Sequence, residues 1–270
     1  MPIDYPTNPP FKEGHVLVFD DEFKSATLDK SKWLPYYMPQ WCSRKTSATN
    51  YELGGDRLIL KIDHDQAPWP PQASEGLKVS SLQTGVYSGP MGSKLGQHRI
   101  QEQWTVKEAQ EITRLFTPQY GYFEIRAKAL ANTNNLCALW MIGFEEVPEQ
   151  SAEICIMEVN GAQIEANRAV NGYGVKAFND PNIETEFFQD SFEMDATGFN
   201  IYAADWQPDY VDFYLNNQKV KRVNQSPNYP MQLMLNIYEF APEREETDDA
   251  YPKKFEVDYV RVFQRPEHKC

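Results

Sequence analysis

Short runs of alternating apolar and polar residues, separated by Gly, Pro, Asn and Asp, recur along the 270-residue chain. A period of two is typical of strands that bury one face, and no helices alternate with these runs. The pattern predicts strands at residues 15–23, 58–62, 79–86, 120–130, 136–143, 153–160, 172–178, 199–206, 211–216, 219–223, 231–238 and 255–263. Many short strands joined by turns predict an all-β fold, an antiparallel sandwich rather than a parallel sheet.

The connections between these strands differ in kind. Asn216 and Asn217 predict a tight hairpin turn between two strands. Residues 33–47 are irregular and aromatic, and such a loop either borders a binding cleft or packs over the edge of the core. Residues 88–113 depart from simple alternation and carry Gln97, His98, Arg99 and Trp104. We expect them to form an insertion over one rim of the sheet that shapes substrate preference, with one helical turn at residues 106–111.

Residues 151–161, SAEICIMEVNG, hold the candidate chemistry. On a regular strand Glu153 and Cys155 share one face, and the isoleucines that alternate with them fill the other, which we expect to be the core side. Unbroken alternation would place Glu158 on that core side, where an unpaired carboxylate is costly or stays protonated. A β-bulge at residues 156–157 would return Glu158 to the face of Glu153. Two carboxyls on one exposed face, with a thiol between them, suit glycoside hydrolysis.

Composition and charge narrow the partner classes. The formal net charge is −13, from 39 acidic and 26 basic residues. This balance argues against nucleic acid or an anionic membrane as partner, because either requires a basic face, and it suits a neutral or basic substrate. The first 15 residues are polar, and no apolar run of 18 residues occurs, so we expect no secretory signal and no membrane span in the chain as given. The compartment stays open: secreted or periplasmic if a signal was removed, and otherwise cytoplasmic.

No linker, internal repeat or low-complexity segment divides the chain, so we expect a single domain over residues 1–270, with an extended segment at residues 1–14, and a monomer. The four cysteines show no metal-like spacing and predict no disulfide framework; they are Cys42, Cys137, Cys155 and Cys270. The sequence DHD at residues 63–65 suggests a metal site, but three adjacent side chains cannot converge on one ion. The acidic residues 243–249 are expected to form a solvated loop.

Glu153-Ile-Cys-Ile-Met-Glu158 resembles the signature strand of glycoside hydrolase family 16, whose bulged form reads Glu-x-Asp-x-x-Glu, as in laminarinases and lichenases. The resemblance extends over nearly the whole chain in the family's order. It takes in FDDEF (19–23) with Trp33, YGYFEIRAKA (120–129), ALWMIG (138–143), YAADWQPDYVDFYLNNQKV (202–220), LMLN (233–236) and VDYVRVF (257–263). There are two departures. Cys155 stands where the family has Asp, and residues 171–178 lack a His that relatives often carry there.

This resemblance implies a concanavalin A-like β-jelly-roll of two curved sheets, with a sugar-binding cleft across the concave face. On a flat strand the two glutamate Cα atoms would lie about 13 Å apart. A retaining glycosidase needs its carboxyls roughly 5 to 5.5 Å apart, so curvature and leaning side chains must close the gap. The resemblance places cleft residues at Trp140, Trp206, Arg126 and Asn236. It implies no required cofactor, and it suggests a structural calcium on the convex side at Glu22 and Asp258.

The function expected from this resemblance is a retaining endo-glycosidase acting on a polysaccharide, a β-1,3-glucan or a mixed-linkage β-1,3/1,4-glucan. Glu153 would be the nucleophile and Glu158 the acid/base. Two alternatives stay open: a non-catalytic carbohydrate-binding protein on the same scaffold, because Cys155 breaks the catalytic triad, and a transglycosylase.

Cys155 is expected to change the electrostatics of the site. In relatives the central Asp helps to keep the acid/base protonated, because a like charge about 5 Å away costs roughly 3 kcal/mol at an effective dielectric near 20. A thiol beside two carboxylates is expected to stay neutral at pH 7, so it supplies packing and a weak hydrogen bond but little charge. We therefore expect the basic limb of the rate profile at lower pH than with an Asp.

Overall fold

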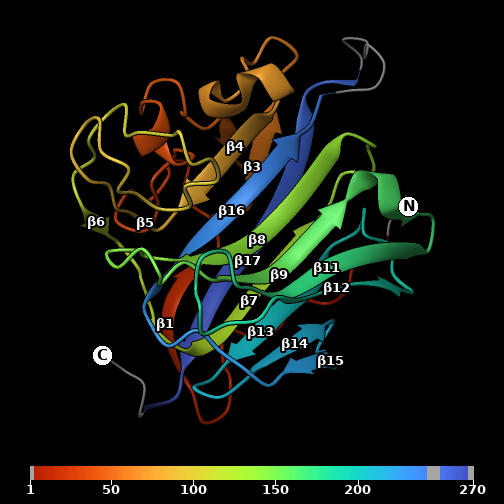
Figure 1. The fold of residues 1–270 in the computed structure, drawn as a ribbon. Helices are drawn as coiled ribbons and strands as arrows, with labels where there is room; N and C mark the ends of the chain where they lie inside the picture. The colour runs from red at the N-terminus through yellow and green to blue at the C-terminus, as the bar shows by residue number, and fades with distance from the viewer. Residues whose placement is uncertain (1–2, 242–249, 267–270) are drawn as a thin grey trace.

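The computed structural model describes residues 3–241 and 250–266 and consists of two antiparallel sheets stacked face to face (Figure 1). The front sheet has the strand order β10 (Ile164–Glu165), β11 (Arg168–Lys176), β9 (Glu153–Asn160), β8 (Asn135–Gly143), β16 (Met231–Glu239) and β4 (Lys78–Gln83), with β12 (Glu186–Phe192) paired to β11. The back sheet has the order β15 (Gln218–Val223), β14 (Val211–Leu215), β13 (Asn200–Trp206), β7 (Gly121–Lys128), β17 (Lys253–Gln264), β3 (Leu58–Ile62) and β2 (Tyr51–Leu53), with β1 (Val16–Asp21) paired to β17. This is the antiparallel jelly-roll sandwich that the sequence predicts.

Smaller elements lie between the strands of these sheets. They include a two-stranded ladder of β5 (Gly85–Val86) and β6 (Thr113–Arg114), and the short 3₁₀ helices η1 (Pro39–Trp41), η2 (Pro70–Glu75) and η3 (Gly161–Gln163). The twelve predicted strands all occur, with ends shifted by a few residues at most positions. The sequence pattern missed the short strands β2, β6 and β10. It also missed β12, an edge strand whose side chains are half-buried or exposed along its whole length. Such a strand carries no clear apolar face, because it packs little surface against the core.

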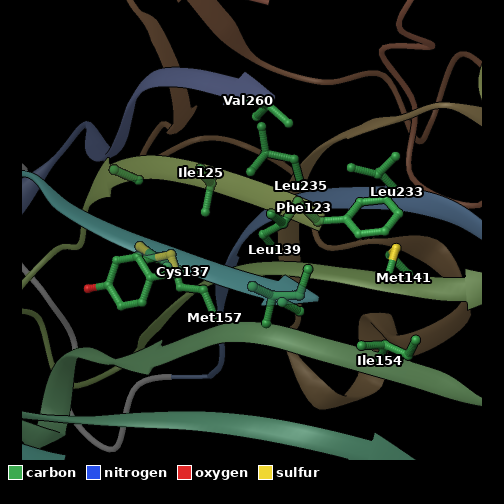
Figure 2. Close-up of a cluster of buried hydrophobic side chains, with 14 of the residues drawn as sticks. Phe123, Ile125, Cys137, Leu139, Met141, Ile154, Met157, Leu233, Leu235 and Val260 are labelled. Carbon is green, nitrogen blue, oxygen red and sulfur yellow. The ribbon is translucent and has the colours of Figure 1, made fainter. Parts of the chain in front are cut away.

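The core lies between the two sheets, and Figure 2 shows part of it. Phe123 and Ile125 of β7 point toward the front sheet, where they meet Leu139 of β8 and Leu235 of β16, and all four side chains are fully buried. Burying one such side chain stabilises the fold by about 1.5–3 kcal/mol relative to leaving it in water. The inner faces of the two sheets therefore form a rigid base for the outer face of the front sheet.

The β-bulge predicted in the signature strand is present. Along the pair of β8 and β9, Leu139 lies opposite Met157 and Trp140 lies opposite Cys155, so Ile156 is the extra residue. Ile156 and Met157 both turn into the core between the sheets, at 1% and 0% exposed. As a result Glu158 lies on the same outer face as Glu153, which confirms the reason given for the bulge.

Gly174 allows the neighbouring strand β11 to follow this bulge. Its φ is +140°, and a Cβ at this position would lie 2.2 Å from the carbonyl oxygen of Glu186 on β12. An L side chain is therefore excluded by both conformation and space. The predicted hairpin turn between β14 and β15 is also confirmed, since Asn216 and Asn217 have φ of 49° and 65°, the left-handed conformation that such a turn requires.

Residues 88–113 form the predicted insertion, which lies in yellow beside β5 and β6 at one end of the front sheet (Figure 1). The helical turn predicted at residues 106–111 is wrong, because these residues contain no helix. Their backbone N–H groups bond elsewhere instead. Val106 N donates to Ser93 O and Gln110 N to Ser88 Oγ, both within the insertion, and Lys107 N donates to Gln40 O.

Several other expectations concern the N-terminal segment, the cysteines and the acidic residues 243–249. Residues 3–14 run along the back sheet, where Tyr5 N donates to Phe199 O and Asn8 Nδ2 donates to Glu124 Oε2. The thiols of Cys42, Cys137 and Cys155 are free. Cys270 and the acidic residues 243–249 lie outside the described residues. Within the part of the chain that the structure describes, no helix is long and apolar enough to cross a membrane.

Candidate active site

A pocket of about 250 Å³ opens on the outer face of the front sheet, above the bulge. Glu153 and Glu158 of β9 line it, as does Lys176 from the end of β11. Its remaining walls are Tyr37, Gln72, Leu77, His98, Leu136, Ala138, Trp140, Tyr238 and Phe240. The two glutamates expected to act together therefore face one cavity of a size that can hold a sugar ring.

Lys176 bridges the two glutamates. Its Nζ lies 2.9 Å from Glu158 Oε1 and 3.5 Å from Glu153 Oε2. Since both oxygens contact one nitrogen, they are no farther apart than the sum of 2.9 and 3.5 Å, about 6.4 Å. The cross-strand register explains the contact, because Lys176 on β11 lies directly opposite Glu153 on β9. The bulge thus brings the carboxyls together without requiring large side-chain movements.

Cys155 lies under the two glutamates, with no exposed surface. Its Sγ donates a weak hydrogen bond to Glu153 Oε2, 3.7 Å away. Burial raises the pKa of the Cys155 thiol well above its ordinary value, and the charges of Glu158 and Glu153 raise it further. The thiol is therefore neutral at pH 7, which agrees with the sequence-based expectation.

The two basic side chains of the pocket differ in charge. Burial opposes the charge of Lys176, but the carboxylates of Glu153 and Glu158 outweigh burial and raise the pKa of this ammonium. Burial lowers the pKa of His98 below its ordinary value, despite the opposing effect of Glu153. The site at neutral pH therefore contains a charged lysine and a neutral imidazole.

His98 reaches the pocket from the insertion. Its Nδ1 lies 3.4 Å from Glu153 Oε1, and its ring stacks on Phe178 with centroids 4.6 Å apart. Its backbone N–H donates to Glu145 Oε1 at 2.7 Å. Glu145 is itself buried, and burial raises the pKa of its carboxyl well above the ordinary value, with a further contribution from Glu153.

Aromatic side chains form much of the remaining wall. Trp140 is 5% exposed and lines the pocket, as the resemblance implies, and its Nε1 donates to Asn236 Oδ1 at 2.6 Å. Asn236 is fully buried and is not among the residues that line the pocket. It orients the Trp140 indole, and its contact with sugar stays a prediction. Phe240 lies at the rim with 45% of its surface exposed. An exposed ring at the mouth of a pocket can stack on the apolar face of a sugar.

Two predicted cleft residues lie elsewhere, and both predictions are wrong. Trp206 of β13 points into the core between the sheets, where it is fully buried and contacts Tyr120 and Phe123. Arg126 is on β7 of the back sheet, and its Nη1 pairs with Asp258 Oδ2 at 2.6 Å. The resemblance assigned both residues to the cleft, but β7 and β13 belong to the sheet that does not carry the pocket.

The suggested calcium site does not fit this structure. Glu22 pairs with Arg261 through both of its carboxylate oxygens, and Asp258 pairs with Arg126. Carboxylates already neutralised by different arginines do not form an oxygen cage for a hard cation. Among residues 3–241 and 250–266, no group of three or more His, Cys, Asp or Glu side chains could hold a metal ion, and residues 63–65 are no exception.

The sequence reasoning missed the roles of His98, Lys176, Glu145 and Tyr37. Lys176 sits within the segment that lacks the family's His, so its position next to the signature strand was an available signal. His98 was noted in the insertion, but nothing local indicates which way a loop folds. The irregular residues 33–47 serve both proposed roles, since Tyr37 lines the pocket while Trp41 packs against Trp104.

Comparison with known sequences agrees with this picture. The family model described as Glycosyl hydrolases family 16 matches residues 77–261. The beta-glucanase of Acetivibrio thermocellus is 26% identical over 262 residues, which cover 95% of this chain and 63% of that protein. The keratan-sulfate endo-1,4-beta-galactosidase of Sphingobacterium multivorum is 26% identical over 276 residues, covering 93% of this chain and 55% of that protein. The chain thus spans less than two thirds of the length of these relatives.

Solved structures show the same fold. The GlcNAcα1-4Gal releasing endo-β-galactosidase from Clostridium perfringens matches with a TM-score of 0.84 and 29% identity, over 99% of this chain and 66% of that chain. The laminarinase from Flavobacterium sp. UMI-01 matches with a TM-score of 0.62 and 20% identity, over 92% of this chain and 100% of that chain.

Proposed function

The chain belongs to glycosyl hydrolases family 16, and from this premise we propose that it is a retaining endo-glycosidase that acts at Glu153 and Glu158. The observation that carries the proposal is the pair of carboxylate oxygens held within about 6.4 Å of each other in one pocket. Retaining enzymes hold their carboxyls roughly 5–5.5 Å apart, whereas inverting enzymes leave about 6.5–9.5 Å for a water molecule. The limit applies to this one pair of oxygens and lies below the inverting range, which is consistent with the double-displacement mechanism.

The surroundings of the two glutamates support different roles for them. Glu153 is the more enclosed, with 9% of its side chain exposed, and it contacts His98, Lys176 and Cys155. A carboxylate that is held from several sides suits a nucleophile that attacks the anomeric carbon. Glu158 is 19% exposed and lies nearer to solvent. It would protonate the leaving oxygen and then take a proton from the water that releases the sugar.

The first candidate substrate is a β-glucan with 1,3 or mixed 1,3/1,4 linkages. Curated relatives named beta-glucanase and glucan endo-1,3-beta-glucosidase support it. The aromatic walls and the net charge of −13 are consistent with a neutral glycan, because an anionic chain would be repelled. Among the described residues that line the pocket, Lys176 is the one charged base, and it is already paired with both glutamates.

A second candidate substrate is a glycan with internal β-galactosidic bonds. The specific observation in its favour is the TM-score of 0.84 with the Clostridium perfringens endo-β-galactosidase, against 0.62 with the Flavobacterium laminarinase. The alternative of a non-catalytic binding protein is less favoured, since both carboxyls are retained beside the neutral thiol.

The test is a panel of β-glucans and β-galactans, with products sized and reducing ends counted. An endo-acting hydrolase releases internal fragments early, a transglycosylase makes longer products, and a binding protein releases none. A 2-deoxy-2-fluoro glycosyl fluoride of the cleaved sugar should label Glu153. Release of fragments from only one polymer class decides between the two substrates.

Variants assign the two roles. Glu153→Ala should lose turnover by several powers of ten while keeping affinity for sugar, because the aromatic walls stay intact. Glu158→Ala should be far slower on polysaccharide than on an activated aryl glycoside, and azide should restore its activity with retained configuration. Glu165→Ala, which removes an exposed glutamate from β10 of the same sheet, is the matched control and should behave as wild type. Equal losses on both substrates in Glu158→Ala would mean that this residue is structural.

A further inference from the structure

The insertion of residues 88–113 is anchored beside the pocket by Gln97. This side chain is 1% exposed, and its Nε2 donates to Gln232 Oε1 at 2.7 Å on β16. Its backbone carbonyl accepts from Trp41 Nε1 at 2.8 Å. A buried amide bonded on both its side chain and its backbone has little freedom to move. These bonds therefore fix the position of the next residue, His98.

Three residues from different parts of the chain lie against the His98 ring: Phe178, Trp140 and Glu153. It stacks on Phe178 with an interplanar angle of 18°, and its centroid lies 5.2 Å from that of Trp140. His98, Phe178 and Glu145 all have φ in the left-handed region, at 53°, 49° and 58°. Residues other than glycine rarely adopt this conformation, and they keep it only where their surroundings over-determine it. The strained backbone and the two aromatic rings thus hold the imidazole in one position.

One ring nitrogen of His98 has no ordinary partner. Nδ1 is buried and makes no hydrogen bond within residues 3–241 and 250–266, while Glu153 Oε1 lies 3.4 Å away and only 9% of either side chain is exposed. Unpaired buried polar atoms are rare in native proteins. Hydrogen bonds that serve catalysis are often long in the free enzyme and tighten when substrate binds.

We propose that His98 is a positioning residue for the nucleophile: its Nδ1–H donates to Glu153 Oε1 and holds the carboxylate in one orientation. This inference rests on the proposed function. A neutral imidazole carries a single N–H, and the neighbouring carboxylate selects the tautomer with the proton on Nδ1. The donor comes from the insertion, so this loop takes part in the chemistry as well as in the shape of the pocket.

The test uses His98→Gly, because glycine adopts a φ of 53° without strain and leaves an imidazole-sized space between Phe178 and Trp140. The rate at which a 2-fluoro glycosyl fluoride labels Glu153 should fall about 10- to 100-fold, by analogy with the loss of a side chain that orients a metal ligand. KM for an aryl glycoside should change little, because the aromatic walls Trp140 and Phe240 remain.

Added imidazole should restore labelling in His98→Gly, whereas 1-methylimidazole, which has no N–H, should not. His98→Phe keeps the stacked ring and removes the donor, so it should show the same loss without rescue by either compound. His15→Gly removes an imidazole far from the pocket, and neither this control nor the wild type should respond to imidazole.

Wild-type labelling rates in both His98 variants would overturn the inference while leaving the proposed function intact. Equal rescue by both compounds would also overturn it, since that result means that the ring only fills space. If the wild-type enzyme is not labelled at Glu153 at all, the proposed function and the role of His98 both fail.

Discussion

Removing the charge of Lys176 should move the basic limb of the rate profile to higher pH. The proposed acid/base, Glu158, must carry a proton when the first bond breaks, and the Lys176 ammonium, 2.9 Å from its Oε1, opposes that protonation. In Lys176→Gln this opposition is absent, while the side chain keeps a similar length. Because its pKa is raised, Lys176 is charged throughout the relevant pH range, so its own titration does not shape the wild-type profile.

The magnitude follows from the geometry. Two unit charges 2.9 Å apart attract by about 1.4 kcal/mol in water and by about 5.7 kcal/mol at an effective dielectric near 20. Lys176 is 31% exposed and Glu158 is 19% exposed, so solvent screens the pair in part and a value near the middle, about 3 kcal/mol, applies. That energy corresponds to roughly two pH units. The remaining repulsion between the two glutamates acts in the same direction.

The assay is kcat/KM on the cleaved polysaccharide from pH 4 to pH 10, for wild type and variants in one buffer series of constant ionic strength. Lys128→Gln is the matched control, because Lys128 lies 2.9 Å from Glu256 with 27% and 20% of the two side chains exposed, but on the back sheet. The basic limb of the rate profile of Lys128→Gln should lie at the same pH as in wild type. A limb that moves down in Lys176→Gln, or moves by the same amount in the control, would refute the electrostatic reasoning.

Three further predictions concern single residues. Cys155→Asp should also move the basic limb to higher pH and Cys155→Ser should move it little, since only the first adds a charge beside Glu153; an unmoved limb in Cys155→Asp would contradict this account. Glu145 has a raised pKa, so its contribution to stability is complete below its ordinary value of 4.5 and is lost as pH rises through the folded value; urea midpoints of Glu145→Gln should therefore fall less with rising pH than those of wild type. Trp206→Ala should lower the free energy of unfolding by about 3–5 kcal/mol while leaving KM unchanged, because its indole fills the core; a raised KM at full stability would restore this residue to the cleft.

Resemblance, rather than periodicity, produced the cleft assignments that failed. Alternation along β13 correctly separates two faces, with Tyr202, Ala204 and Trp206 on the side that proves to be the core. It does not tell which of two stacked sheets a strand joins, because both sheets bury one face in the same core. The resemblance therefore assigns Trp206 and Arg126 to the cleft, whereas strand pairing places β13 and β7 in the back sheet.

Local sequence patterns are enough to predict most strands, the sandwich, the bulge and the shared face of Glu153 and Glu158. These follow from local chemistry, since a carboxylate cannot stay in an apolar core and one extra residue is enough to turn it outward. The groups that surround the two glutamates, in contrast, are known only from tertiary contacts. Lys176 arrives through the register of β11, and His98 arrives from a loop anchored 55 residues before Glu153 in the chain. Such contacts depend on long-range pairing and on burial, which no pattern of neighbouring residues encodes.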